Sequence, residues 1–126
     1  MIEDNPADAR LVDLILEEVP TLKAKIEVVD KLRKGLKKLR DKNYDLVLLD
    51  LTLPDSTGFD TIKKLIQQHK EMPIVVMTGL EDEQLAIDCV KSGAQDFILK
   101  GNFDERNLVR VFNYAIERHQ LHLQLD

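Results

Sequence analysis

The sequence predicts an α/β protein in which helices cover both faces of a parallel sheet. Short apolar runs alternate along the chain with longer stretches in which apolar residues recur every three or four positions, and this alternation is typical of successive βαβ units. The apolar runs at 46–49 and 74–77 are continuous, as expected for strands that are covered on both faces. The length of 126 residues fits one domain with one core.

Five helices and four clear strands are expected in alternation. Asn5 is the expected N-cap of the first helix, with Pro6 in its first turn, and Asp30 is expected to cap the second. Apolar residues at 59, 62, 65 and 66 indicate a third helix, Gly93 is expected to end a fourth, and Asp104 to cap the fifth. The expected strands are 26–29, 46–51, 74–78 and 97–99.

The two ends of the sequence are less regular. Only Met1 and Ile2 precede an acidic pair at the place where a first strand should end, and a full strand would need about four more residues. We therefore expect a first strand that is either vestigial or compensated from outside these residues. Residues 119–126 contain no Gly or Pro stop signal, and we expect them to continue the last helix beyond a domain at 1–118.

Composition and charge exclude several classes of protein. No apolar run approaches the roughly 20 residues needed to span a bilayer, and no basic and apolar leader follows Met1. The single cysteine, Cys89, cannot form an internal disulfide and is expected to be buried, which fits a reducing cytoplasm. The net charge of -5 argues against nucleic acid binding, and the basic run 31–40 is interpreted as a solvated helix face.

Polar residues follow the ends of the expected strands. Glu3 and Asp4 follow the first, Asp50 ends the third, Thr78 ends the fourth and Lys100 follows the fifth. In an open parallel sheet these positions meet at one edge, where ligands bind. Carboxylates held close together repel one another, and Mg²⁺ relieves that repulsion by oxygen coordination. A strand-end Asp could then attack phosphorus to give an acyl phosphate, while a lysine and a hydroxyl contact the phosphoryl oxygens.

Four segments in this order resemble the receiver domains of two-component response regulators: IEDNPADARL, DLVLLDLTLPDSTG, PIVVMTG and GAQDFILKG. The resemblance covers nearly the whole chain apart from the first strand. It implies a flavodoxin-like, doubly wound parallel sheet of five strands in the order 2-1-3-4-5 with five helices, the first strand being truncated. It also implies that Asp50 accepts a phosphoryl group from the phosphohistidine of a histidine kinase.

The resemblance further implies roles for the surrounding residues. Mg²⁺ would be bound by Asp4, Asp50 and the backbone carbonyl of Thr52, with Glu3 acting through a water. Thr78 and Lys100 would contact the phosphoryl group. Phe97 would be the aromatic switch, although an aromatic on a strand can equally belong to the core.

The implied partners are a sensor histidine kinase or phosphotransfer protein and a downstream effector or fused output domain. No direct contact with nucleic acid or a membrane is expected, and the sequence leaves open whether the chain forms a homodimer.

The sequence also departs from the family pattern. Gly101 follows Lys100 where most receivers have a proline in a cis peptide, so the loop at Lys100 is expected to be less constrained. Leu80 offers no hydrogen bond to a water attacking the acyl phosphate, which predicts slow self-dephosphorylation by a chain that is not a turnover enzyme. Thr52 lies where haloacid dehalogenase-like hydrolases need a second Asp, which argues against a hydrolase. The remaining alternative is a receiver-like interaction scaffold without phosphotransfer.

Overall fold

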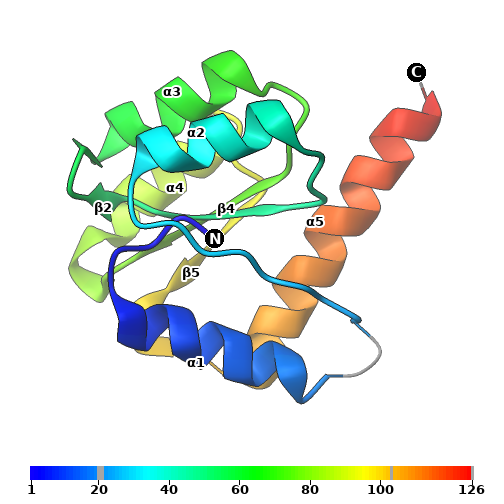
Figure 1. The fold of residues 1–126 in the computed structure, drawn as a ribbon, viewed down its shortest axis with the longest axis horizontal. Coiled ribbons are helices and arrows are strands. Elements are labelled where there is room, and N and C mark those ends of the chain that lie inside the picture. Colours follow the sequence, from blue (N-terminus) through cyan, green and yellow to red (C-terminus); the bar gives the residue numbers. More distant parts are fainter. Residues whose placement is uncertain (20–21, 103, 126) are drawn as a thin grey trace.

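A parallel sheet forms the centre of the computed structural model, which describes residues 1–19, 22–102 and 104–125 (Figure 1). Its strands lie in the order β1-β4-β5. Leu49 pairs with Val76 between the first two, and Val76 pairs with Phe97 between the last two. These strands correspond to the three continuous or strongly apolar runs of the sequence. Their bounds are β1 Val47–Asp50, β4 Ile74–Thr78 and β5 Asp96–Leu99.

The first two positions of the expected sheet are reduced to single bridges. Ile2 bridges in parallel to Val29 on one side and to Leu49 on the other. The Ile2 N–H donates to the Leu48 carbonyl at 2.8 Å, and the Asp50 N–H donates to the Ile2 carbonyl at 2.9 Å. The order 2-1-3-4-5 is therefore confirmed, with a vestigial first strand. The expected strand at 26–29 is wrong as a strand, because only its last residue has a bridging partner in the short segment beside it.

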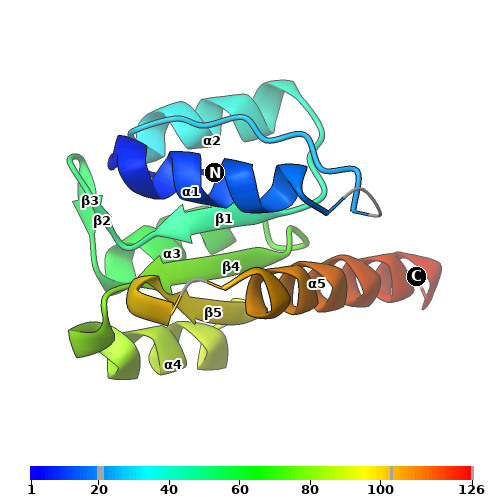
Figure 2. The same ribbon diagram turned by 90° about the horizontal axis from the view of Figure 1, so that it is seen from below.

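In the described part of the chain, five α-helices cover the sheet in two layers. Figures 1 and 2 show α1 and α5 on one face and α2, α3 and α4 on the other. The helices are α1 Pro6–Glu17, α2 Leu32–Asp41, α3 Phe59–Gln68, α4 Glu83–Lys91 and α5 Glu105–Leu125. This arrangement confirms the predicted fold class.

The side chains of the sheet alternate between the two layers, as the period of a strand requires. Leu49 and Val76 point into the core on the side of α2, α3 and α4, whereas Leu48, Val75 and Met77 point toward α1 and α5. All five are at most 3% exposed. Burial of both faces explains why these strands are continuous apolar runs in the sequence.

Most of the predicted helix ends are confirmed. The Asn5 side chain accepts hydrogen bonds from the first turn of α1, and Pro6 is its first residue. Gly93 follows α4 with a φ of 132°, a conformation that favours glycine. Asp104 accepts from the Asn107 N–H at 2.7 Å at the start of α5.

The cap of α2 comes from a distant residue. The expected cap, Asp30, is wrong, because its carboxylate pairs with Lys34 at 2.9 Å instead. The carboxylate of Asp55 accepts from the N–H groups of Leu32 at 2.8 Å and Arg33 at 3.0 Å. Asp55 belongs to the turn of a hairpin that the sequence pattern did not predict, formed by β2 Thr52–Leu53 and β3 Ser56–Thr57. The hairpin follows β1 in the chain and contacts the start of α2 through Asp55.

Two short 3-10 helices were also not predicted: η1 Leu80–Asp82 after β4 and η2 Lys100–Asn102 after β5. They approach one another, because a Cβ added to Gly101 would lie 3.0 Å from Leu80 Cδ1. The absence of a side chain at Gly101 therefore makes room for Leu80, which is 55% exposed.

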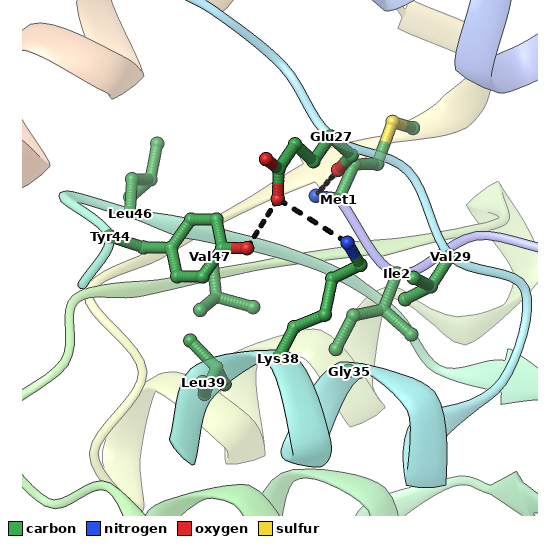
Figure 3. Close-up of a pocket in the computed structure, with 10 residues that line it drawn as sticks. All are labelled: Met1, Ile2, Glu27, Val29, Gly35, Lys38, Leu39, Tyr44, Leu46 and Val47. Atoms are coloured by element: carbon green, nitrogen blue, oxygen red, sulfur yellow. Dashed lines mark hydrogen bonds and ion pairs between the residues drawn. The ribbon is translucent and has the colours of Figure 1, made fainter. Parts of the chain in front are cut away.

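A small ionic cluster lies at the amino end of the sheet, around Glu27 (Figure 3). Its carboxylate accepts a hydrogen bond from the Tyr44 hydroxyl and pairs with Lys42 and, at 3.6 Å, with Lys38. The Met1 amine donates to the Glu27 backbone carbonyl at 2.8 Å. Beside this cluster, a cavity of about 350 Å³ extends under the segment 22–27 toward α1 and α5.

The last helix continues through the tail as expected, reaching Leu125, while Asp126 lies outside the described residues. Cys89 is fully buried, as expected from the apolar stripe in which it stands. In the part of the chain that the structure describes, no helix combines the length and apolar character needed to cross a membrane.

Candidate functional site

The candidate site lies at the carboxyl ends of the parallel strands. Glu3 directly follows the bridging residue Ile2, Asp50 is the last residue of β1, and Lys100 directly follows β5. In Figure 2 the start of α1, the β2–β3 hairpin and the ends of β1 and β4 lie together at the left of the molecule. The fold therefore brings these side chains to one edge, as the sequence predicted.

Three carboxylates gather at this edge. Oxygen atoms of Glu3, Asp4 and Asp50 all lie within 4.8 Å of one another. Glu3 and Asp50 are each only 2% exposed, whereas Asp4 is exposed. Backbone groups hold the two buried carboxylates, because the Thr52 N–H donates to Asp50 Oδ1 at 3.1 Å and the Asn5 N–H donates to Glu3 Oε2 at 3.3 Å.

The Lys100 ammonium is the cation of this cluster. Its Nζ lies 2.7 Å from Glu3 Oε1, 3.1 Å from Asp8 Oδ2 and 3.3 Å from Asp50 Oδ2. The contact with Asp50 is a hydrogen bond donated by the ammonium. Glu3 Oε1, by contrast, is buried and has no aligned hydrogen bond from any residue that the structure describes, although it forms an ion pair with Lys100.

Burial and mutual repulsion change how these groups hold protons. Burial, followed by the neighbouring Asp50 carboxylate, raises the pKa of Glu3 to about 8 against the opposing effect of Lys100. Burial alone would lower the pKa of Lys100, but Glu3, Asp50 and Asp8 outweigh it and raise that pKa above its ordinary value. One lysine therefore does not neutralise the excess negative charge of the edge.

The donor set fits a hard divalent cation. Mg²⁺ prefers oxygen ligands and is usually held by one or two protein carboxylates together with waters. Asp4 supplies an exposed carboxylate, Asp50 a buried one, and Glu3 a buried oxygen that lacks an aligned donor. The unbalanced negative charge makes such an ion electrostatically favourable here.

Two further predicted residues flank this cluster. Thr78 ends β4, is 2% exposed and lies one residue beyond Met77, which pairs with Asp50. Phe97 lies in β5, three residues before Lys100. It is half-buried and packs against the core on the side of α2, α3 and α4.

Sequence reasoning missed Asp8, whose carboxylate contacts Lys100 from the first turn of α1. A signal was available, because an acidic residue in the first turn of a helix that follows Glu3 and Asp4 must lie near the same edge. The pattern alone did not indicate which cation it would meet.

Comparison with known proteins identifies the family to which the chain belongs. The response regulator receiver domain family matches residues 1–113. The luminescence regulatory protein LuxO of Vibrio campbellii is 34% identical over 113 residues, which are 90% of this chain and 24% of that protein. The chemotaxis protein CheY of Thermotoga maritima is 29% identical over 109 residues, covering 84% of this chain and 89% of CheY. The chain thus spans about a quarter of the length of the LuxO proteins that it matches.

Solved structures show the same fold. The receiver domain of NtrX from Brucella abortus superimposes with a TM-score of 0.82 at 27% identity, covering 92% of this chain and 95% of that one. A structure of NtrX from the same organism gives a TM-score of 0.86 at 26% identity over 98% of this chain, but only 27% of NtrX is covered.

Proposed function

Because the chain belongs to the response regulator receiver domain family, we propose that Asp50 accepts a phosphoryl group from the phosphohistidine of a sensor histidine kinase or phosphotransfer protein. The observation that carries the proposal is the position of Asp50. Its carboxylate is buried at a strand end, is held by the Thr52 N–H, and lies between two acidic neighbours and the Lys100 ammonium. The fold alone does not require such a concentration of charge.

The reaction is proposed to depend on Mg²⁺. Asp4, Asp50 and the backbone carbonyl of Thr52 would hold the ion, and Glu3 would act through a water. When bound, the ion neutralises charge on the carboxylates and on the incoming phosphoryl oxygens.

The residues of the chain then have separate tasks. An Asp50 oxygen attacks phosphorus, the phosphorus–nitrogen bond to the donor imidazole breaks, and the imidazole leaves after taking up a proton. The Lys100 ammonium and the Thr78 hydroxyl donate hydrogen bonds to the phosphoryl oxygens. Positioning and charge neutralisation supply the catalysis, because no further covalent step is needed.

The acyl phosphate is proposed to shift the chain between two pre-existing conformations. Its added negative charge and acceptor oxygens would favour the form in which Thr78 and Lys100 contact it, with Phe97 changing rotamer. Self-dephosphorylation would be slow, because Leu80 offers no hydrogen bond to the attacking water. The chain would thus be a switch rather than a turnover enzyme.

The biological setting is proposed by analogy with the relatives. The chain would act in the cytoplasm on a downstream effector or a fused output domain, without direct contact to nucleic acid or a membrane. The receiver domain would span 1–118, and residues 119–126 would form an extension of its last helix.

Intact-mass spectrometry after incubation with acetyl phosphate tests the proposal. The wild type should gain one phosphoryl group only when Mg²⁺ is present. Asp50→Asn, which keeps the size of the side chain but removes the nucleophile, should gain none under the same conditions.

The alternative is a receiver-like interaction scaffold without phosphotransfer. An absent adduct in the wild type with Mg²⁺ would favour that alternative and contradict the proposal. An adduct that persists in Asp50→Asn would show that another residue is the acceptor.

A further inference from the structure

The Lys100 ammonium has one carboxylate partner that does not belong to the acidic cluster. Asp8 approaches it to 3.1 Å from α1, while Glu3 and Asp50 approach it from the sheet edge. The side chains of Lys100 and Asp8 are 23% and 25% exposed, so this ion pair is largely screened from water. An ammonium group has three N–H donors, and here three carboxylates surround it.

From this arrangement we propose that Asp8 is a positioning residue that holds the Lys100 ammonium beside Asp50 during phosphotransfer. The inference rests on the proposed function and adds a residue to it. Cation binding and phosphorylation would both engage the carboxylates of Glu3 and Asp50, and their attraction for the Lys100 ammonium would then be weaker. Asp8 is the partner that remains available to Lys100 throughout.

The backbone at Lys100 explains why a side-chain anchor is needed. Lys100 begins the single-turn helix η2 and is followed by Gly101, which restrains the backbone less than any other residue. The ammonium of Lys100 is separated from this backbone by a flexible four-carbon side chain. Its contacts with the three carboxylates therefore determine where the ammonium lies.

Asp8 itself is well fixed. It lies in the first turn of α1, where the Asn5 side chain accepts from the N–H groups of Ala7 at 2.9 Å and Asp8 at 3.4 Å. Pro6 opens the helix, and Ala9, next to Asp8, is only 9% exposed. Because the backbone at Asp8 is already held in the helix, the ion pair with Lys100 requires little further ordering of that backbone.

A purely structural role is the competing explanation. A carboxylate in the first turn of a helix stabilises it by interaction with the helix dipole, whatever cation is nearby. That role would change the stability of α1 but not the position of Lys100. The two explanations therefore differ in what happens to the lysine.

The test compares wild type with Asp8→Ala, Asp8→Glu and Asp13→Asn, all saturated with Mg²⁺. Asp8→Glu keeps the negative charge, and Asp13→Asn removes one charge from the same helix without touching Lys100. One readout is the rate at which acetic anhydride labels the Lys100 amine, measured on the peptide by mass spectrometry. The other is the initial rate of adduct formation from acetyl phosphate.

We expect Asp8→Ala to raise Lys100 labelling and to lower the rate of adduct formation, each by about tenfold, as for the loss of one charged hydrogen bond. Asp8→Glu should restore much of both, and Asp13→Asn should match the wild type. Unchanged labelling in Asp8→Ala would overturn the proposal, and so would raised labelling with an unchanged rate. If the wild type formed no adduct, the proposed function would fail, while the labelling would still decide whether Asp8 holds Lys100.

Discussion

Glu3 and Glu27 lie at opposite ends of the same sheet, each beside at least one lysine, and their pKa values move in opposite directions. Burial and the nearby Asp50 carboxylate raise the pKa of Glu3 to about 8. Hydrogen bonds from Lys42 and then Tyr44 lower the pKa of Glu27 to about 2. Glu3 shares its lysine with other carboxylates in a closed site, whereas Glu27 has several donors to itself at the surface.

The comparison shows that a lysine partner does not by itself decide the charge state of a carboxyl group. Removal from water and a second carboxylate outweigh one ammonium at the carboxyl edge. The amino edge is a stabilising surface cluster, whereas the carboxyl edge retains repulsion that a divalent cation can relieve. Binding of a divalent cation would therefore stabilise the carboxyl edge.

The largest effect on stability is expected when the Lys100 ammonium is removed from the carboxyl edge of the sheet. Lys100→Met should destabilise the metal-free protein by about 3 kcal/mol at pH 8, because Glu3 and Asp50 would remain buried without a positive partner. Urea unfolding followed by circular dichroism measures this difference. Lys42→Met is the matched control at the amino edge and should cost far less; equal costs for the two variants would break the comparison.

Neutralising the buried Glu3 should stabilise the protein, whereas removing the Lys100 ammonium should destabilise it. The folded state raises the pKa of Glu3, so ionisation of Glu3 disfavours folding increasingly as pH rises from 4.5 toward about 8. Glu3→Gln should therefore stabilise the metal-free protein at pH 9, by on the order of 2 kcal/mol, with little effect at pH 4. Unfolding at both pH values tests this. A loss of stability at pH 9 would show that Lys100 already compensates Glu3 fully.

Asp55 is a third kind of carboxylate, because its hydrogen-bond donors are backbone N–H groups and not a lysine. Asp55→Ala should cost about 1 kcal/mol, because the first turn of α2 loses both of the bonds that Asp55 accepts. Asp30→Ala, at the position that the sequence pattern indicated, should change stability little. Thermal unfolding of the two variants decides between them, and a larger loss in Asp30→Ala would contradict the structural assignment of the cap.

The smallest effect is expected at Glu27, whose lysine partners are exposed. Because the folded state lowers the pKa of Glu27, its contribution to stability is present above pH 4.5 and is lost as pH falls toward 2. Glu27→Gln should therefore be slightly destabilising at pH 7 and neutral near pH 2. Stabilisation at pH 7, which is the sign expected for Glu3→Gln, would remove the distinction between the two ends of the sheet.

Local patterns in the sequence were sufficient for much of the fold. The continuous apolar runs located β1 and β4, and Asn5 and Gly93 marked helix ends, because each depends on neighbours within one turn or one strand. Prediction failed where a long-range partner intervened. Asp30 has the right spacing for a cap, yet a carboxylate 25 positions further along the chain reaches the same N–H groups.

Most residues of the candidate site could be predicted from the sequence, but the contact between Asp8 and Lys100 could not. The strand-end positions of Glu3, Asp50 and Lys100 could be read from the sequence, because parallel strands bring their carboxyl ends to one edge. The contact of Asp8 with Lys100 could not, because it depends on the distance between a helix and a loop that are more than 90 residues apart.

The sequence by itself determined the fold class, the strand-end acidic positions and most helix boundaries, since these follow from periodicity and local hydrogen bonding. Only the tertiary structure decided that Ile2 bridges two neighbours, that Asp55 caps α2 and that Lys100 is shared among three carboxylates. The physical reason is that charge interactions depend on distance and burial. Those two quantities are fixed only when segments that are remote in the chain pack together.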